Sequence, residues 1–422
     1  HAVIEHRADG AWLRDLESKN GTRVNGALAP IAEPGVVLSE GAIITLGKTT
    51  IRYRDPAAAA LGGAATDGTR TVVSTYDAFL GDLVLVDVAA DGTRRFTAID
   101  GVPDETPTYD PATYRGGVAT PGPDVGYHTS VALKGGLARV AYQDHDALAL
   151  KFAIETSAGA WKTYVVQDDT AAAVGAYASL TLDGTGAPAI AYLAENVPAA
   201  GGALETQLRL ARARTADPEQ STDWTLTTVA SAIGSCAGRC ASGDVCLAPA
   251  ADGDPETCAT PGGGCPTACA DDQACVGGAC RTAIPTPTAG DLPQGTGLFV
   301  NLVTLPDGKL AMVFYDRSRT SLVMLVEDAP GAGAFTETVL DATGDRGMWA
   351  SALVGPDGAL HVAYQDARAD TVHYLSWNGA PSASELVDDG TRAGDRTHPV
   401  GAGATVFLRG GAPAIAYQDA AT

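Results

Sequence analysis

Residues 347–366 read Gly-Met-Trp-Ala-Ser-Ala-Leu-Val-Gly-Pro-Asp-Gly-Ala-Leu-His-Val-Ala-Tyr-Gln-Asp. This stretch predicts two short strands joined by a tight turn at Asp357-Gly358, because an Asp-Gly pair tolerates the positive φ that such turns need. The chain repeats this pattern of a leading glycine, a strand, a Gly-containing turn and a second strand ending near tyrosine. The clearest copies begin at Gly126, Gly175, Gly297 and Gly347. Self-similarity at a fixed period indicates a repeat architecture.

The repeat also contains a third strand and a fourth. The third strand alternates apolar and polar residues, and the fourth often begins near an aromatic residue: Phe96, Trp161, Trp224 or Phe335. The leading glycines lie 49, 122 and 50 residues apart, which predicts a unit of about fifty residues with one large insertion. Four antiparallel strands at this period predict a β-propeller blade. Residues 71–422 resemble the bacterial repeat whose second strand reads Ile-Ala-Tyr-x-Asp, found in propeller-type extracellular proteins, and we expect five blades and a sixth that is incomplete.

Residues 1–55 form a different piece, with short apolar runs separated by Asp-Gly and Asn-Gly pairs. His1, the run Asp-Leu-Glu-Ser-Lys-Asn-Gly-Thr at 15–22, Val-Asn-Gly at 24–26 and residues 38–47 stand in a characteristic order and spacing. This segment resembles the C-terminal half of a forkhead-associated (FHA) domain, a β-sandwich that binds phosphothreonine peptides.

The resemblance implies roles for five residues. Ser18, Lys19 and Asn20 fall in the loop that contacts the phosphopeptide, while His1 supports that loop and Asn25 shapes the neighbouring turn. Donors on rigid loops recognise phosphate because it offers several strong acceptor oxygens. The family's phosphate-holding Arg, and the Ser just before the family's histidine, would both lie upstream of His1. We therefore expect a partial domain that binds phosphothreonine poorly as it stands.

The insertion contains all of the cysteines. An even count, Gly/Pro/Asp-rich filling and few hydrophobic residues predict a loop segment held by disulfides, with pairing inside each of two similar units of four. A zinc site is the alternative, since four thiolates can suffice, although the close pairs are separated by three residues and no histidine lies among them. The eight residues are Cys236, Cys240, Cys246, Cys258, Cys265, Cys269, Cys275 and Cys280.

Composition and cysteine usage limit which cellular compartments and which classes of partner fit the sequence. The formal net charge of −22 argues against a basic nucleic-acid-binding face. No apolar run reaches the roughly 18 residues that a membrane-spanning helix requires. Disulfides persist outside the cytosol, so we expect an extracellular or cell-surface protein. A cytoplasmic location is the alternative if the FHA segment determines it.

Two columns of side chains are expected on one face of the propeller, around its central channel. One column carries rings at the start of each first strand, and the other carries acids at the end of each second strand. Rings beside carboxylates suit a glycan or a protein partner. The same residues equally suit structural roles, with rings packing between blades and acids accepting turn amides. The candidates are His128, Tyr177, Phe299, Trp349 and His398, with Asp77, Asp144, Asp316, Asp366 and Asp419.

These observations lead to one functional expectation and two alternatives. We expect a non-enzymatic modular recognition protein without catalytic residues, metal or cofactor. One alternative is a propeller glycoside hydrolase or lyase that uses channel-face carboxylates, and another is a cytosolic phosphothreonine-dependent scaffold. The expected domains are the partial FHA domain (1–55), a linker (56–70), blades one to three (71–232), the Cys-rich insertion (233–285) and blades four to six (286–422).

Overall fold

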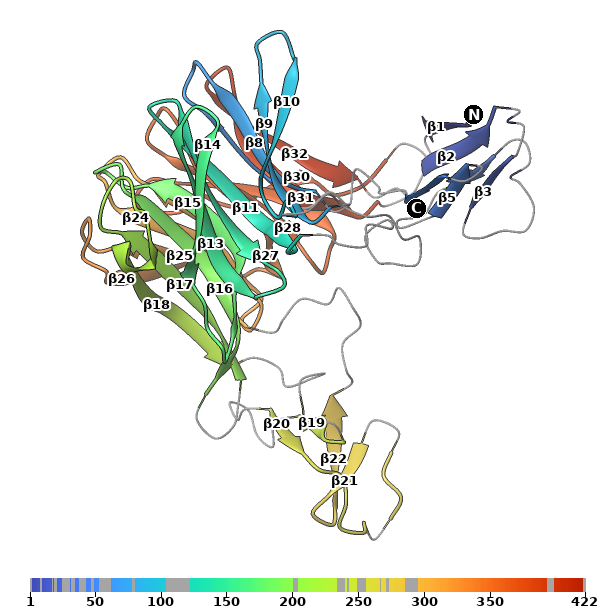
Figure 1. The fold of residues 1–422 in the computed structure, drawn as a ribbon. Helices are drawn as coiled ribbons and strands as arrows, with labels where there is room; N and C mark the ends of the chain where they lie inside the picture. Colours follow the sequence, from blue (N-terminus) through green and yellow to red (C-terminus); the bar gives the residue numbers. More distant parts are fainter. Residues whose placement is uncertain are drawn as a thin grey trace. The chain divides into compact units, whose positions relative to one another are not determined.

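The structure is a computed structural model of the chain. Within residues 2–419 it describes all but 8–9, 17, 19–20, 25–30, 32–34, 38–42, 47–48, 53–61, 78–79, 104–121, 200–203, 234–239, 241–242, 249–255, 266, 271–272, 285–294 and 393–397. The described residues are all-β apart from one 3₁₀ turn at Ser221–Asp223 (Figure 1). The chain forms two compact units, one of residues 1–146, 153–163 and 420–422 and one of residues 147–152 and 164–419.

The first unit begins with two small three-stranded sheets that share one core. Leu13 and Ile44, both almost fully buried, come from different sheets and pack with Ala2, Val24, Ile31 and Val36. This is a small β-sandwich, as the sequence predicts. One sheet has the order β1 (Ala2–Arg7), β2 (Gly10–Asp15), β4 (Val36–Val37), and the other β3 (Thr22–Val24), β5 (Ile43–Leu46), β6 (Thr49–Arg52).

Four-stranded sheets follow, each strand paired with the next along the chain. The first contains β7 (Gly63–Thr66), β8 (Thr71–Asp77), β9 (Asp82–Val88) and β10 (Arg94–Asp100). The next contains β11 (Val125–Lys134), β12 (Leu137–Asp144), β13 (Ala149–Ser157) and β14 (Ala160–Gln167).

Besides the small sheet of the insertion, the described part of the second unit contains three four-stranded sheets and one pair of strands. They are β15 (Ala173–Leu182), β16 (Pro188–Pro198), β17 (Leu204–Ala213) and β18 (Trp224–Ile233); β23 (Leu298–Thr304), β24 (Leu310–Asp316), β25 (Ser321–Glu327) and β26 (Phe335–Asp341); β27 (Arg346–Val354), β28 (Leu360–Asp366), β29 (Thr371–Trp377) and β30 (Glu385–Asp388); and β31 (Val400–Arg409) with β32 (Ala412–Asp419).

The first strands of the sheets in the second unit are neighbours in space. β15 contacts β23, β23 contacts β27 and β27 contacts β31. Serial four-stranded meanders whose first strands adjoin are the arrangement of β-propeller blades. β24 contacts β27 and β28 contacts β31, the first strands of the next sheets, and every residue of β24 and β28 is buried. This explains the continuous apolar run that precedes the final Asp of β24, since a strand covered on both faces does not alternate apolar and polar residues.

The segment expected to be a linker contains a strand, and this expectation was wrong. β7 lies inside residues 56–70 and pairs with β8. Its small residues are needed for close packing rather than for flexibility. A Cβ on Gly63 would lie 2.8 Å from the Cα of Ser130 on β11, which is shorter than real contacts allow. The Ala/Gly composition therefore marks the tightly packed first strand of the first blade.

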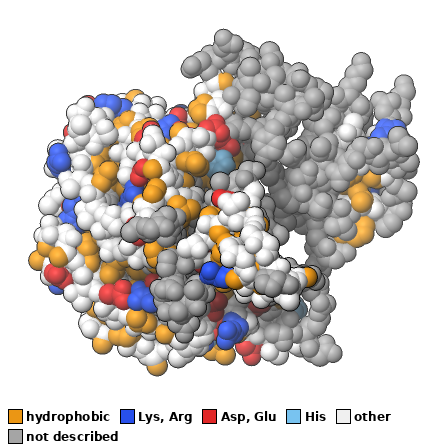
Figure 2. All heavy atoms as spheres, turned by 90° about the horizontal axis from the view of Figure 1, so that it is seen from below, with side chains coloured by type: hydrophobic (Ala, Val, Ile, Leu, Met, Phe, Trp, Pro, Cys, Tyr) orange, Lys and Arg blue, Asp and Glu red, His pale blue; other side chains and the backbone are white. Residues whose placement is uncertain are grey.

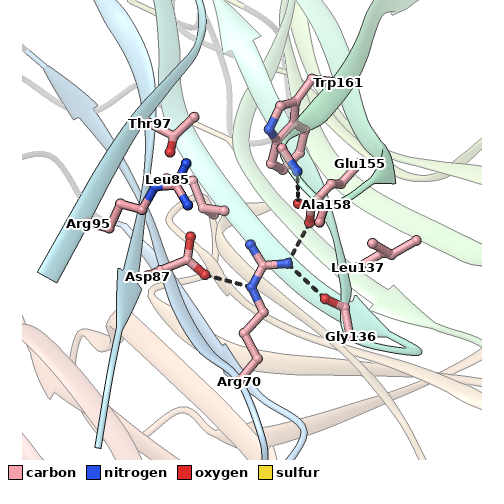
Figure 3. Close-up of a pocket in the computed structure, with 11 residues that line it drawn as sticks. Arg70, Leu85, Asp87, Arg95, Thr97, Gly136, Leu137, Glu155, Ala158 and Trp161 are labelled. Carbon is pink, nitrogen blue, oxygen red and sulfur yellow. Dashed lines mark hydrogen bonds and ion pairs between the residues drawn. The ribbon is translucent and has the colours of Figure 1, made fainter. Parts of the chain in front are cut away.

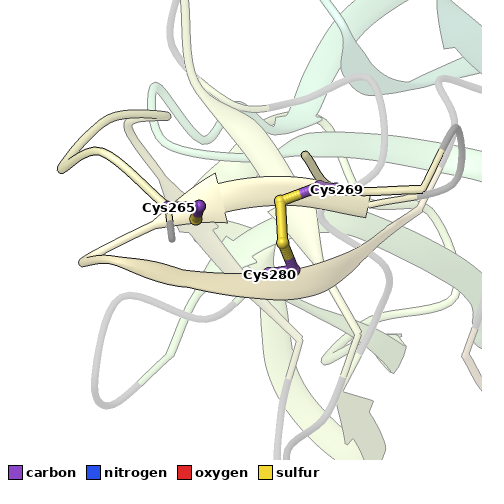
Figure 4. Close-up of side chains that lie close together, drawn as sticks. All are labelled: Cys265, Cys269 and Cys280. Carbon is purple, nitrogen blue, oxygen red and sulfur yellow. A yellow bond between two sulfur atoms is a disulfide. The ribbon is translucent and has the colours of Figure 1, made fainter. Parts of the chain in front are cut away.

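The insertion forms a small sheet rather than a bare loop. Its strands are β19 (Val245–Leu247), β20 (Thr257–Ala259), β21 (Gln273–Val276) and β22 (Ala279–Ile284). The described disulfides are Cys240–Cys258, Cys265–Cys275 and Cys269–Cys280, each within one of the two predicted units. Figure 4 shows the bond between Cys269 and Cys280. Cys246 is also disulfide-bonded, and Cys236 lies outside the described residues. These bonds confirm the disulfide prediction for the described cysteines.

A tyrosine in the second strand of each blade bonds to a residue at the edge of a neighbouring blade. Tyr364 Oη donates to Asp341 Oδ2 at 2.7 Å, where Asp341 ends β26. Tyr142, Tyr192 and Tyr417 make the same bond to Asp100, Gln167 and Asp388. In the first blade and in the blade after the insertion, the tyrosine donates instead to an acid before the next blade, as in Tyr76 to Asp124 and Tyr315 to Asp345. The tyrosine of the repeat is therefore an inter-blade contact.

Tyr364→Phe is expected to lower the free energy of unfolding by about 1–3 kcal/mol, because buried Asp341 loses a hydrogen-bond donor. Tyr417→Phe is the matched control. It removes the same bond at a more exposed position, where water replaces the hydroxyl, so about 1 kcal/mol or less is expected. Chemical denaturation of both variants measures the difference. Equal losses would contradict a role for burial.

Candidate functional site

The ring column predicted from the sequence occupies one structural position. His128, Tyr177, Phe299 and Trp349 have φ values of 48°, 53°, 52° and 54°, in the left-handed region that non-glycine residues rarely adopt. Each lies at a register shift where a first strand bulges away from its second strand. At the same bulge in β31 the residue is Gly403, with φ 63°. The expectation that His398 continues this column was wrong, because His398 precedes β31.

In the second unit the column forms a continuous aromatic contact. The ring centroids of Tyr177 and Phe299 are 4.8 Å apart, and those of Phe299 and Trp349 are 4.7 Å apart. Phe299 is buried, whereas Tyr177 and Trp349 are partly exposed. In the first unit, burial and then the nearby His145 lower the pKa of His128 to about 4, so its imidazole is neutral at pH 7.

The acid column mainly closes the turns between second and third strands. Asp366 Oδ1 accepts the N–H groups of Arg368 and Ala369 at 2.9 and 3.1 Å, and Asp316 Oδ1 accepts that of Arg319 at 3.1 Å. Asp77 accepts the N–H of Leu80 at 3.3 Å. These are the turn-amide contacts that favour a structural role. Asp144 is buried at the corresponding end of β12.

Asp419 is the exception in this column, because its carboxylate is shared by an arginine and a histidine. Arg392 Nη2 lies 2.7 Å from Asp419 Oδ2, and His398 Nδ1 lies 2.7 Å from Asp419 Oδ1. The side chains of Arg392, His398 and Asp419 are 33%, 22% and 36% exposed. Hydrogen bonds from Arg392 and then His398 lower the pKa of Asp419.

The N-terminal sandwich presents one of the predicted phosphopeptide residues. Ser18 Oγ donates to Asp15 Oδ1 at 2.7 Å, and Thr22 Oγ1 donates to the same oxygen at 2.5 Å. These bonds fix the loop after β2, and the one from Thr22 contributes most to the lowered pKa of Asp15. His1, Lys19, Asn20 and Asn25 lie outside the described residues.

A pocket of about 450 Å³ lies in the first unit, between strands of the first two blades (Figure 3). Arg70 lies at its centre, with Asp87 of β9 on one side and Glu155 of β13 on the other. Trp161 of β14 and Arg95 of β10 also line it. We call this cavity the Trp161 pocket. Its remaining lining residues are Leu85, Thr97, Gly136, Leu137, Ala158 and Gly159.

Arg70 holds the two carboxylates of the Trp161 pocket in place. Its Nε lies 2.6 Å from Asp87 Oδ1, and its Nη1 lies 2.5 Å from Glu155 Oε2. The Glu155 side chain is only 2% exposed, and it also accepts the N–H groups of Ala138 and Gly159, both at 2.9 Å. Burial opposes its ionisation, but the bonds from Arg70, Gly159 and Ala138 outweigh burial and lower the pKa of Glu155. The carboxylate is therefore ionised at neutral pH.

This pocket was not predicted from the sequence. Arg70 fell in the expected linker, and only Trp161 was noticed, as a fourth-strand aromatic. A usable signal was present in the third strands, because Glu155 and Glu327 each end an apolar run. Glu327 makes the equivalent contacts in the second unit, with Arg212 at 2.7 Å and the N–H groups of Leu310 and Gly333. Within the described residues the Arg–Glu bridge therefore recurs as a contact between two blades. The Arg70–Glu155 bridge lines a cavity.

The surface agrees with the acidic composition. On the face drawn in Figure 2, Lys and Arg side chains lie singly among acidic ones and form no basic patch. Among the described residues there is no helix long and apolar enough to cross a membrane.

Comparison with known families identifies the N-terminal segment. Residues 1–47 match the FHA domain. No curated protein matches the chain.

Several solved structures are similar to the chain at low identity. AofleA from Arthrobotrys oligospora is 12% identical, with 84% of this chain and 78% of that chain covered and a TM-score of 0.40. The Hadza microbial sialidase Hz136 is 10% identical, with 87% and 67% covered and a TM-score of 0.46. CoXyl43, a GH43 β-xylosidase/α-arabinofuranosidase from a compost microbial metagenome, is 11% identical, with 79% and 96% covered and a TM-score of 0.36.

These comparisons correct one expectation. The expectation that the chain is not an enzyme is overturned by neighbours that are glycoside hydrolases, such as CoXyl43 and a thermostable family-43 enzyme. At these identities and TM-scores the likenesses assign no substrate and no reaction to this chain. What the comparisons and the fold establish together is an FHA segment followed by β-propeller blades and a disulfide-bonded insertion.

Proposed function

We propose that the β-propeller binds carbohydrate in the Trp161 pocket. The observation that carries this proposal is the combination of an indole ring with two carboxylates and two guanidinium groups around one cavity of about 450 Å³. This volume lies in the range of small-molecule sites, which are concave and carry a few well-placed polar groups.

The chemistry of the lining matches a sugar ring. A pyranose has an apolar C–H face, which suits contact with the indole of Trp161, and a rim of hydroxyl groups that need donors and acceptors. Glu155 and Asp87 supply acceptors, while Arg95 and Thr97, on the same side of the pocket as Asp87, supply donors (Figure 3). Because Arg70 already bonds to Asp87, Glu155 and the carbonyl of Gly136, these groups are held in position before a ligand arrives.

Trp161→Ala is expected to weaken saccharide binding at least tenfold, because the ring that contacts the sugar face is lost. Binding to an oligosaccharide array, followed by calorimetry with the best ligand, measures this loss. Phe335→Ala is the matched control, since Phe335 begins the fourth strand of a later blade and lines no part of the Trp161 pocket. Equal losses in both variants, or array binding unchanged by Trp161→Ala, would refute the proposal.

Hydrolysis of a glycosidic bond is the second candidate function, and the carboxylate pair favours it. Neighbouring nitrogens of one guanidinium hold Asp87 and Glu155 close together, and glycoside hydrolases use two carboxyl groups. The lowered pKa of Glu155 suits the ionised member of such a pair. Release of reducing ends from a bound oligosaccharide, lost in Asp87→Asn, would support this function. Binding without release of reducing ends would exclude hydrolysis, and carbohydrate recognition would be the remaining function.

We further infer that the FHA segment contributes to recognition of a phosphothreonine peptide, and that the protein acts outside the cytosol. The hydrogen bonds of Ser18 to Asp15 support the first inference, and the disulfides support the second because they persist in oxidising compartments. A phosphothreonine peptide library that fails to shift the NMR signals of the Ser18 loop, in a protein carrying the whole domain, would refute the first. Eight reactive thiols in freshly isolated native protein would refute the second.

A further inference from the structure

The ring column of the second unit stops one position early. Tyr177, Phe299 and Trp349 occupy the same bulge on successive first strands, β15, β23 and β27. The bulge is repeated on β31, where the register shifts between Ala402 and Thr405. Gly403 stands there with the same left-handed backbone, φ 63°. The backbone that would carry a fourth ring is therefore present, and the ring is not.

The neighbouring first strands are joined by the same kind of hydrogen bond at each step. Ser179 Oγ accepts the N–H of Leu302 at 2.9 Å, joining β15 to β23. Asn301 Oδ1 accepts that of Ala352 at 3.3 Å, joining β23 to β27. Ser351 Oγ accepts the N–H of Val406 at 3.1 Å, joining β27 to β31. β31 is thus placed beside β27 as β27 is beside β23.

It follows that Gly403 lies beside Trp349 as Trp349 lies beside Phe299. A Cβ built on Gly403 would meet no heavy atom within 4 Å, so the place of the fourth ring is open space. Trp349 is partly exposed, whereas Phe299, which has rings on both sides, is 5% exposed. The structure therefore has room for one more flat ring against Trp349.

A polar cluster lies at one end of the same two-stranded sheet. Asp419 pairs with Val400 and Gln418 pairs with Ala402, next to the residues that lead into Gly403. The carboxylate of Asp419 is bonded by Arg392 and His398, and all three side chains remain accessible.

We propose that a saccharide ring binds against Trp349 in the space above Gly403, with its hydroxyl groups at Asp419, His398 and Arg392. An apolar ring face with hydrogen-bonding groups at the ring edge matches this combination of indole and polar cluster. This site belongs to the second unit and does not depend on the Trp161 pocket. A chain with both sites binds a saccharide at two places.

Filling the space tests the proposal. Gly403→Trp puts an indole where the ligand ring would lie. The left-handed backbone at this position accepts a non-glycine residue, because four residues already adopt nearly the same φ at the equivalent bulges: His128, Tyr177, Phe299 and Trp349. The probe is a set of fluorescently labelled neutral hexose and pentose oligosaccharides. It is measured in the Trp161→Ala background, so that failure of the Trp161 pocket and failure of this site are separate results.

We expect residual binding in Trp161→Ala that Gly403→Trp weakens at least tenfold. Gly410→Trp is the matched control, because Gly410 has φ 61° and also meets nothing within 4 Å, but lies in the turn at the far end of β31. It should leave binding unchanged. If Gly403→Trp unfolds the protein, Trp349→Leu supplies the same loss of binding. No residual binding in Trp161→Ala, or residual binding that survives both Gly403→Trp and Trp349→Leu, would overturn the proposal.

Discussion

Gly347→Ala is expected to lower the free energy of unfolding by about 3 kcal/mol or more, through backbone strain and overpacking together. Gly347 has φ 116°, a conformation that only glycine adopts readily. An added Cβ would lie 3.1 Å from the Cα of Leu322 and 3.2 Å from the ring of Tyr315, both in the preceding blade. Neither atom can move alone, since Leu322 is in β25 and Tyr315 in β24, and both are buried.

Gly379→Ala separates the two causes. Gly379 also has positive φ, 80°, but its added Cβ would meet nothing within 4 Å. Only the backbone cost of about 1–2 kcal/mol is expected there. Chemical denaturation of both variants, with hydrogen exchange at β27 to localise the change, measures the difference. Similar losses would show that close approach between blades is not what requires glycine at 347.

Glu155→Ala is expected to destabilise the first unit by about 3–5 kcal/mol, because the partly buried guanidinium of Arg70 loses its buried partner and keeps only Asp87 and the Gly136 carbonyl. It also removes the acceptor of two backbone N–H groups, those of Ala138 and Gly159. The N–H of Ala138 is buried, so leaving it unpaired is costly. Thermal unfolding, with hydrogen exchange at β12 and β13 to assign the loss to this unit, is the measurement.

The Arg212–Glu327 bridge provides the control for this prediction. Glu327→Ala removes a carboxylate in the same structural position, but its bonds to Leu310 and Gly333 are longer, 3.3 and 3.2 Å. A smaller loss is therefore expected, confined to the second unit. Saccharide binding should fall in Glu155→Ala and not in Glu327→Ala. Loss of binding in both variants would show that the effect is one of folding.

The contribution of Glu155 depends on pH in a defined direction. Its pKa is lower in the folded protein than its ordinary value near 4.3. Its stabilising effect is therefore complete above the unfolded pKa and is lost as pH falls through the folded pKa. The stability difference between the wild-type protein and Glu155→Ala should shrink below about pH 4. A difference that stays constant into strong acid would contradict this account.

Much of the fold followed from local patterns in the chain. The leading glycines, the buried second strands and the Asp-Gly turns act within one blade, so they are readable as a period of about fifty residues. The two groups of cysteines likewise indicated disulfides, because pairing within each group needs only neighbouring sequence. The turn contacts of the acid column are also local in sequence, because Asp316 and Asp366 bond to amides two or three residues away.

The candidate sites could not be read in this way, because they depend on contacts between blades. Arg70 and Glu155 are far apart in the chain and meet only when two blades pack. His398 was placed in the ring column by spacing, whereas the bulge shows that Gly403 holds that position. The alanines and glycines of β7 resembled a linker, since close packing and flexibility favour the same small residues.

The sequence by itself determined the kind of blade, its period and the covalent cross-links of the insertion, because these rest on interactions between residues close in the chain. Only the tertiary structure decided which side chains face a cavity. The Trp161 pocket and the open space beside Trp349 are both made by the packing of neighbouring blades. That packing is set by inter-blade contacts such as those of Tyr364 and Gly347, whose partners lie in another repeat.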